Sequence, residues 1–208
     1  MNIVANRQDI IDKAEQVFLR YGIKSVTMDD LARELGHSKK TLYQYFDNKD
    51  DLVEHVMKYH VDRTQQIIEG LLERAENAID AYLQINQHHY QFIREMNPSI
   101  LYDIQKYYPS SWHHFHLHKN DFVKGVIRDN LQQGIEEGLF RPDMNVDVIA
   151  LFYIYKMEVF ADAQLLHEHG LERTQCLPEI IKYHLLGIIT PEGRAYLESQ
   201  KFFDHEEA

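Results

Sequence analysis

The segment from Thr27 to Gly36 constrains the fold more than any other stretch of the chain. Thr27 occupies the position of a helix N-cap, and Asp30, three residues later, gives a pattern close to a capping box. Behind this cap, apolar residues repeat at helical spacing, at Met28, Leu31, Ala32 and Leu35. Gly36 follows where the left-handed conformation that ends many helices costs little. The segment therefore predicts a short amphipathic helix with both ends specified.

A second short helix is expected directly after this glycine. Ser38 is its N-cap, and the helix turns only Leu42 and Phe46 inward. Two short helices joined by a tight turn that contains glycine form a helix-turn-helix, whose second helix lies in the DNA major groove. The alternative is an ordinary pair of surface helices whose lysines are simply solvated.

The polar side chains of the second helix suit contact with DNA. Lys39 and Lys40 lie in its first turn, where lysine opposes the helix dipole but is favourable beside phosphate or guanine. Gln44 can bond adenine through both atoms of its amide. We expect base or near-base contacts from Lys40, Thr41, Tyr43 and Gln44, and phosphate contacts from Thr27, Ser38, Lys39, Tyr45 and Lys49.

These residues resemble the tetracycline-repressor (TetR) family of bacterial transcriptional regulators. The matching pattern is Thr27-x-x-x-Leu31-Ala32-x-x-Leu35-Gly36, then Ser38-x-x-Thr41-Leu42-Tyr43-x-Tyr45-Phe46-x-x-Lys49-x-x-Leu52. It begins near Ile10, is specific to about Val56, and continues beyond that only as helix layout and length. The resemblance implies a sequence-specific, ligand-responsive transcriptional regulator, more often a repressor than an activator.

Charge is distributed unevenly along the chain. The net charge is −11, yet residues 1–50 hold eight Lys/Arg and eight Asp/Glu, so all of the excess lies in residues 51–208. We therefore expect a DNA-binding domain at 1–50 and a regulatory domain for ligand binding and dimerisation at 51–208. The acidic remainder should discourage non-specific binding to DNA. No apolar run approaches the ~20 residues of a membrane span, the N-terminus lacks a signal peptide's apolar core, and Cys176 is the single cysteine, so cytoplasm is the expected location.

The pattern along the rest of the chain is helical. A first helix is expected at about residues 8–21 and forms a three-helix headpiece with the two short helices described above. A long helix is expected from Asn48 to about Arg74, and its first half should pack against this headpiece. From Asn77 onward there is no sustained alternation and no hairpin dipeptide. The expectation is an all-α protein of nine or ten helices, with a three-helix headpiece on a larger helical domain.

The larger domain is rich in aromatic residues, with polar groups on or near the same helical stripes. An apolar cavity with a few convergent polar groups is the usual design of a small-molecule site. The alternative is that the aromatic residues are plain core. Our candidates for contact with a small apolar or aromatic effector are Asn86, His89, Trp112, Phe115 and Tyr153.

A histidine-rich run covers residues 113–118, with His114 and His118 one helical turn apart. That spacing can hold a transition metal, but no glutamate or cysteine completes a ligand set, so we predict neither a metal site nor a cofactor. A helical sensing protein without specific DNA readout, possibly metal-responsive through this run, is the alternative function. No phosphate loop, nucleophile elbow or Cys–His arrangement is present, and we predict that the chain is not an enzyme.

Two late helices carry more apolar surface than one side can cover. Residues 180–189 are apolar on more than one face, and the helix over 149–166 has Val148, Leu151 and Tyr155 outside its main stripe. Such a surplus generally meets a partner, so we expect a homodimer about a two-fold axis and hence a palindromic operator. Burial within the monomer is the alternative.

Overall fold

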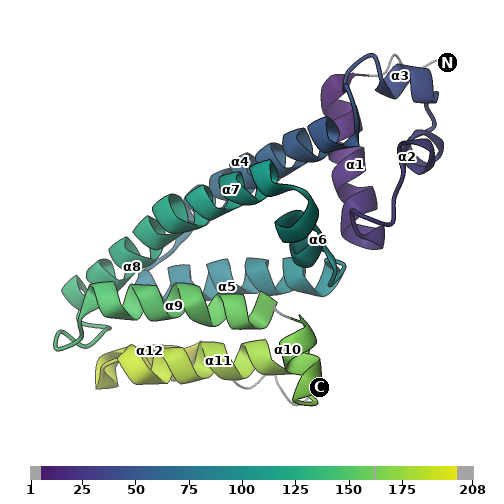
Figure 1. Ribbon diagram of the computed structural model, residues 1–208. Coiled ribbons are helices and arrows are strands. Elements are labelled where there is room, and N and C mark those ends of the chain that lie inside the picture. The colour runs from purple at the N-terminus through teal and green to yellow at the C-terminus, as the bar shows by residue number, and fades with distance from the viewer. Residues whose placement is uncertain (1–5, 162, 201–208) are drawn as a thin grey trace. The chain divides into compact units, whose positions relative to one another are not determined.

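The computed structural model describes residues 6–161 and 163–200. In chain order these form α1 (Arg7–Tyr21), α2 (Met28–Glu34), α3 (Lys39–Leu42), α4 (Lys49–Arg74), α5 (Ala78–Glu95), α6 (Ile100–Tyr107), α7 (Pro109–His118), a π-helical segment η1 (Lys119–Val123), α8 (Lys124–Glu136), α9 (Val146–Ala161), α10 (Ala163–Glu168), α11 (Arg173–Ile188) and α12 (Pro191–Ser199) (Figure 1). Within these ranges there is no β-strand, only an isolated bridge between Phe140 and Ile189. The predicted all-α class is confirmed.

The number of segments differs from the predicted layout because one long helix is interrupted. The apolar repeat that follows Pro109 predicts one long helix ended by Gly138, whereas the structure has α7, then η1, then α8. A π-helical turn inside a helix shifts the hydrogen-bond register, which no apolar periodicity reveals. The helix predicted over 149–166 is observed as α9 and α10, and residue 162 between them lies outside the described residues.

The chain packs as two compact units. The first contains the residues up to 67 together with 92–118, and the second contains 68–91 and the residues from 119 onward. The helices α4 and α5 each contribute residues to both units. The division into a DNA-binding domain at 1–50 and a regulatory domain at 51–208 concerns function rather than packing, and it stays a prediction.

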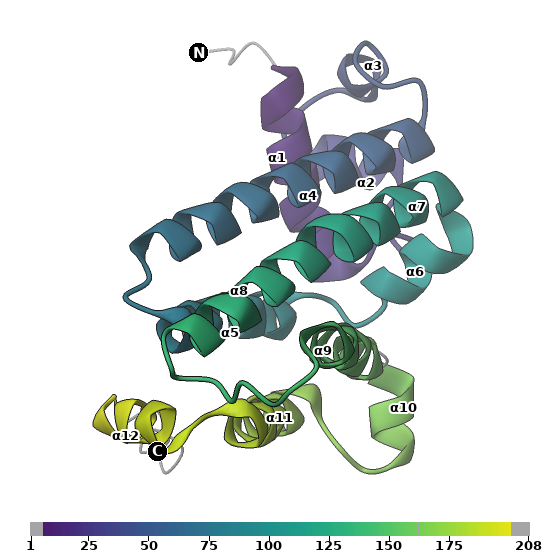
Figure 2. The ribbon, with the colours of Figure 1, turned by 90° about the vertical axis from the view of Figure 1, so that its left-hand side faces the viewer.

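The core of the first unit joins the headpiece to two later parts of the chain. From α1–α3 it takes Ile10, Phe18, Leu31, Leu42 and other buried residues. From the start of α4 it takes Leu52, Val53 and Val56, as predicted, and from further along it takes Met96, Ile100, Ile104 and Tyr108. In Figure 2, α7 runs alongside α4 in this unit, and the hydroxyl of Ser110 donates a hydrogen bond to Glu54 (3.2 Å).

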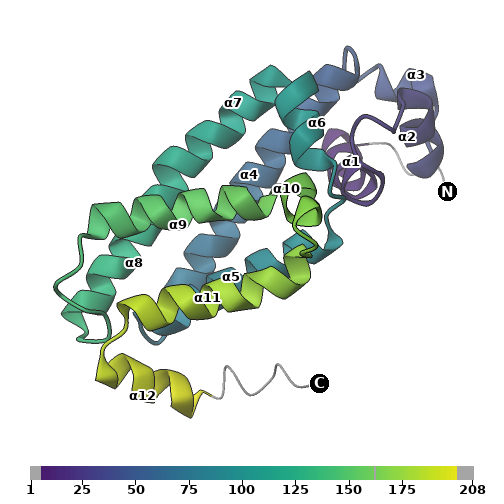
Figure 3. The same cartoon turned by 60° about the horizontal axis from the view of Figure 1, so that its bottom comes forward.

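The second unit brings α5, α8, α9, α11 and α12 together. Its buried residues include Ile79, Tyr82, Leu131, Phe140, Ile154, Leu177, Leu185 and Leu197. The start of α5 is fixed by α8, because Asn130 Nδ2 donates to the Ala78 carbonyl (2.9 Å). The Ala78 N–H in turn donates to Glu137 (2.8 Å). In Figure 3, α9 and α11 run beside each other.

No helix in the described ranges combines the length and the apolar character that a membrane span requires.

A close contact in the second unit gives a stability prediction. Phe140 is fully buried, and a Cβ atom added at Gly134 would lie 2.0 Å from its ring. Because the ring is enclosed on all sides, Gly134→Ala should lower the free energy of unfolding by about 1–3 kcal/mol, as overpacking does. Chemical denaturation followed by circular dichroism measures this change.

Gly125, on the same helix, is the matched control. A Cβ atom there meets no heavy atom within 4 Å. Gly125→Ala should therefore raise stability by up to about 1 kcal/mol through helix propensity. Equal effects of the two substitutions would contradict the packing described for Phe140.

Candidate nucleic-acid interface and candidate ligand site

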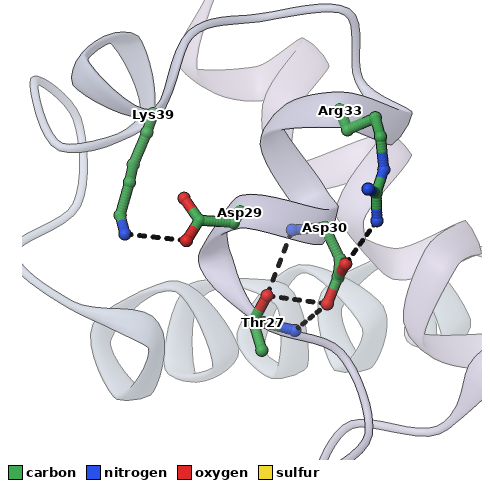
Figure 4. Close-up of polar contacts among 5 residues, drawn as sticks. All are labelled: Thr27, Asp29, Asp30, Arg33 and Lys39. Atoms are coloured by element: carbon green, nitrogen blue, oxygen red, sulfur yellow. Dashed lines mark hydrogen bonds and ion pairs between the residues drawn. The ribbon is translucent and has the colours of Figure 1, made fainter.

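The helix α2 begins with the predicted capping box (Figure 4). Thr27 Oγ1 accepts a hydrogen bond from the Asp30 N–H (3.1 Å), and Asp30 Oδ2 accepts one from the Thr27 N–H (3.0 Å). Hydrogen bonds from Thr27 hold the pKa of the Asp30 carboxyl below its usual range, and the charge of Arg33 lowers it further. The Thr27 hydroxyl also donates to Asp30 (2.7 Å). Thr27 thus has a demonstrated local role, and its phosphate contact stays a prediction.

The turn after α2 depends on the backbone freedom of Gly36. This glycine has φ +69°, in the left-handed region that other residues rarely adopt. The His37 N–H then donates to the Ala32 carbonyl (2.9 Å), which satisfies a carbonyl at the end of the helix. The chain is thereby redirected within three residues, as the sequence predicted.

Ser38 caps α3 and sets which way its side chains point. Its Oγ accepts a hydrogen bond from the Thr41 N–H (3.0 Å) and lies 2.8 Å from the Thr41 hydroxyl. Leu42 and Phe46 are almost completely buried, which fixes the inner face of the segment. The opposite face consequently carries exposed side chains, those of Lys39, Lys40, Tyr43 and Gln44.

The regular part of α3 is only four residues long. Gln44 and Tyr45 lie in the turns that follow it, where the Gln44 N–H donates to the Thr41 carbonyl (3.2 Å). The Phe46 N–H donates to the Leu42 carbonyl (3.0 Å), so the helical path continues to the buried phenylalanine. Tyr45 is half-buried against the core of this unit.

Lys39 has an acidic partner within the protein. Its Nζ lies 2.9 Å from Asp29 Oδ2, as Figure 4 shows. This hydrogen bond, together with the charge of Asp29, raises the pKa of the lysine. From the sequence, DNA was expected to supply the negative charge that offsets a lysine at a helix start, but Asp29 already provides one. Both side chains are exposed, and exposed pairs contribute little, so a phosphate can replace Asp29.

Lys49 is also engaged within the protein. Its Nζ donates a hydrogen bond to the Ile23 carbonyl (2.6 Å). Burial lowers the pKa of this half-buried ammonium, and the neighbouring charge of Lys24 lowers it further. Lys49 therefore holds the connection between α1 and α2, and its expected contact with phosphate stays a prediction.

All nine predicted DNA-contacting residues lie in the first unit. Thr27 caps α2, Lys49 is the first residue of α4, and the other seven lie between Ser38 and Tyr45. Two further residues of this surface were not predicted, namely Asp29 and Arg7, whose guanidinium carbon lies 5.3 Å from the centre of the Phe46 ring. Neither pairing follows a helical spacing, so no sequence signal marks it.

Two of the predicted ligand-binding residues meet in the second unit. The Tyr153 hydroxyl on α9 donates a hydrogen bond to Asn86 Oδ1 on α5 (2.8 Å), and both residues are buried. Asn86 Nδ2 donates to the Tyr82 carbonyl one turn earlier (2.7 Å). His89 lies one turn further along α5 and is half-buried.

Trp112 and Phe115 belong to the first unit, where their rings stack with centroids 5.7 Å apart. Phe115 borders a cavity of about 50 Å³ whose lining also includes Phe18, Met57 and Phe92. That volume is far below the ~300 Å³ at which typical ligand pockets begin. The ligand-binding role of the five residues stays a prediction.

The Asn86–Tyr153 pair lies within a larger buried cluster that the sequence analysis did not define. The His184 ring on α11 stacks on Tyr82 (5.5 Å between centroids) and meets Tyr153 edge-on (5.1 Å). Lys156, one turn after Tyr153, places its Nζ 4.1 Å from the Tyr153 ring centre. Burial lowers the pKa of Lys156 to about 7. Burial, followed by the charge of Lys156, lowers the pKa of His184 to about 3.

The histidine-rich run on α7 does not form a metal site in the described part of the chain. In that part, no group of three or more His, Cys, Asp or Glu side chains could hold an ion. His114 instead lies 3.9 Å from Glu54, and the His116 ring lies edge-on to Trp112 (4.6 Å). The metal-responsive alternative therefore has no ligand set among these residues.

Comparison with known proteins identifies relatives of this chain. Residues 10–56 match the family model described as bacterial regulatory proteins, tetR family. The HTH-type transcriptional repressor KstR2 of Mycobacterium tuberculosis is 26% identical over 157 residues, covering 71% of this chain and 76% of the repressor. The HTH-type transcriptional regulator YvaF of Bacillus subtilis is 27% identical over 172 residues, covering 81% and 88%.

Solved structures agree with the fold. A TetR-family regulator from Agrobacterium tumefaciens has a TM-score of 0.72 at 15% identity, covering 88% of this chain and 97% of its own. The ketosteroid regulator KstR2 of Mycobacterium tuberculosis has a TM-score of 0.56 at 20% identity, covering 91% and 97%.

The buried lysine gives a prediction for stability against pH. In the unfolded chain Lys156 keeps its proton to a pH of ~10.4, whereas the folded protein releases it near pH 7. Between these values the unfolded state binds more protons, so the free energy of unfolding should rise with pH, by up to about 1.4 kcal/mol per unit from this group. Lys156→Met should remove this contribution and be more stable than the parent at pH 7.

Denaturant titrations at pH 7, 8 and 9 measure both effects. Lys124→Met, which alters an exposed lysine of the same unit, is the control and should keep the slope of the parent. A slope that is the same in Lys156→Met and in the parent would show that the ammonium is not the titrating group.

Proposed function

The chain belongs to the TetR family of DNA-binding transcriptional repressors, and we propose that it acts as a homodimer on a palindromic operator and leaves that operator when a small molecule binds. The observation that carries the proposal is the two-faced character of the segment Ser38–Phe46. Its inner face is buried through Leu42 and Phe46, and its outer face exposes lysine, tyrosine and glutamine. The same role places the protein in the cytoplasm, where the chromosome is accessible.

Base recognition is assigned to the exposed face of α3 and the turn after it. Gln44 can bond adenine through its amide, and Thr41 and Tyr43 lie beside it on the segment. Lys40, in the first turn, suits a guanine or a nearby phosphate. Ser38, Lys39 and Tyr45 are assigned to the sugar–phosphate backbone, where contacts fix position rather than sequence.

Dimerisation is assigned to the helices α9 and α11 of the second unit. The first has Val148, Leu151, Phe152 and Tyr155 exposed at helical spacing, and the second has Tyr183 and Leu186 exposed. Phe152 is 70% exposed and Tyr183 is 81% exposed, although both side chains are large and carry aromatic rings. An apolar stripe of this kind on two neighbouring helices favours a self-complementary interface about a two-fold axis.

Two-fold symmetry in the protein predicts symmetry in the operator. A dimer that fits successive major grooves places its recognition helices about 34–36 Å apart, so the half-sites should be inverted repeats. The helix α4 contributes residues to both units, which makes it the covalent path from a ligand site to the headpiece.

The effector is assigned to the second unit, around Asn86, His89 and Tyr153; Trp112 and Phe115, which belong to the first unit, stay separate candidates. A ligand can release DNA only through a difference in its affinity for the free and DNA-bound forms, typically about 1–3 kcal/mol of coupling. By reciprocity, saturating operator must weaken effector binding by the same factor.

The test of DNA binding is a gel shift with the DNA directly upstream of the chain's own coding region. Gln44→Ala should cost on the order of 1–3 kcal/mol at one base position and relax the preference there. Lys40→Ala, if the lysine contacts phosphate, should weaken binding to all sequences and reduce the salt slope by about 1. Lys58→Ala, at an exposed position of α4, is the control.

If no specific complex forms, or if both variants bind a selected operator as the parent does, the outward face of α3 does not read DNA. A helical sensing protein without specific DNA readout would then be the better description.

The test of dimerisation is sedimentation of apolar-face variants. Phe152→Glu and Tyr183→Glu place a charge on each exposed stripe, so the double variant should sediment as a monomer at micromolar concentration. Tyr102→Glu alters a residue of the first unit that is 54% exposed and should leave association unchanged. A parent chain that is monomeric at micromolar concentration would exclude this interface.

A further inference from the structure

Three buried polar atoms meet in the second unit without a hydrogen bond of normal geometry in the described part of the chain. They are Lys156 Nζ on α9, His184 Nε2 on α11 and the Tyr82 hydroxyl on α5, of which the hydroxyl has only a weak interaction with Tyr153. Buried polar atoms are nearly always paired, and each exception needs a reason. Three such atoms in one cluster indicate a site where a ligand supplies the missing hydrogen-bond partners.

The described side chains of the cluster supply no charged acceptor for the buried ammonium. Asn86 Oδ1 accepts from the Tyr153 hydroxyl, and the Tyr82 carbonyl accepts from Asn86 Nδ2. The Lys156 ammonium has no acidic partner among the side chains that the structure describes; the Tyr153 ring lies against it, and the His184 imidazole is near enough to be influenced by its charge. A cation–π contact offsets part of the cost of burying a charge, about 2 kcal/mol when desolvated. A bound anionic group would offset the remaining cost of burying the charge.

Among the described titratable groups of the cluster, Lys156 is the one that carries a positive charge. Burial lowers the pKa of His184 to about 3, so this imidazole is neutral. Burial raises the pKa of Tyr153 to about 12 and raises that of Tyr82 as well, so neither phenol is ionised. A ligand with one negative charge therefore balances the site, whereas a phosphate dianion would leave one charge unpaired.

We propose that this cluster binds the carboxylate of a small organic acid, with Lys156 as its counter-ion and with His184 and Tyr82 as further donors. The rings of Tyr82, Tyr153 and His184 suit an apolar or aromatic body on the same molecule. The inference rests on the proposed function, since it names the chemical class of the effector.

The experiment compares carboxylates with alcohols of the same skeleton. The probes are 3-phenylpropanoate and octanoate against 3-phenylpropan-1-ol and 1-octanol, titrated calorimetrically into the full chain at pH 6.5. Because charge-assisted hydrogen bonds contribute more than neutral ones, the parent should bind each carboxylate on the order of tenfold more tightly than its alcohol. Lys156→Met should lose that preference, and Lys124→Met, changed at an exposed lysine of α8, should keep it.

A second measurement uses pH. Carboxylate binding requires the protonated ammonium, so affinity in the parent should fall by up to about tenfold per pH unit above pH 7. The affinities of the alcohols should stay level over the same range, and Lys156→Met should show no pH dependence. A purely structural lysine would move none of these readouts.

Three results would overturn the proposal. They are no binding of either carboxylate at millimolar concentration, equal binding of carboxylate and alcohol by the parent, or a Lys156→Met variant that retains the preference. A Lys156→Met variant less stable than the parent at pH 7 would likewise show that the ammonium is already paired within the chain.

Release of the operator is measured separately with the same probes. Carboxylate binding without any change in operator affinity would leave the site intact and refute the proposed induction. Operator release by the alcohols alone would support induction and refute the carboxylate site.

Discussion

Burial of the headpiece's apolar faces is the constraint on which the rest of this structure depends. Three short helices of about fifty residues cannot enclose a core of their own, because small domains bury too little of their surface. Leu52 and Val53 from α4, with Ile100 and Ile104 from α6, complete that core. The backbone N–H of Lys24 also donates to the buried carboxylate of Asp103 (2.8 Å). The orientation of the recognition segment thus depends on residues far along the chain.

Two buried charged groups differ in whether the described side chains neutralise them. The Glu15 carboxylate in the first unit is 4% exposed, and it is paired with His60 (2.7 Å) and Arg63 (3.2 Å). Such a pair leaves nothing for a ligand to satisfy, so it is structural. Lys156 in the second unit lies against the Tyr153 ring and has no acidic partner among the described side chains. A charge that the described side chains leave unbalanced is expensive to keep for stability alone, which is why a binding role explains it better.

The charge distribution of the headpiece favours selectivity between DNA sequences over strong non-specific binding to DNA. Residues 1–50 are neutral overall, and Lys39 at the start of α3 is paired with Asp29. Non-specific DNA binding draws almost entirely on positive charge facing phosphate, and residues 1–50 carry no net positive charge. Under the proposed function, base contacts from residues such as Gln44 are therefore expected to supply much of the affinity for a correct sequence.

The sequence by itself determined the features that arise between near neighbours. The capping box at Thr27, the turn at Gly36, the Ser38 cap and the inward Leu42 and Phe46 follow from contacts at most five residues apart or from helical periodicity. The exposed apolar stripes on α9 and α11 could likewise be predicted from the helical spacing of their apolar residues.

Only the tertiary structure decided which distant side chains meet. It paired Lys39 with Asp29, turned Lys49 toward the Ile23 carbonyl and joined Asn86 to Tyr153 across 67 residues. It also placed Trp112 in a different unit from Tyr153 and brought His184 and Lys156 into one buried cluster. Such partners are selected by how whole helices pack. The residue spacing along one helix shows which face is apolar, but it does not predict which other helix packs against that face.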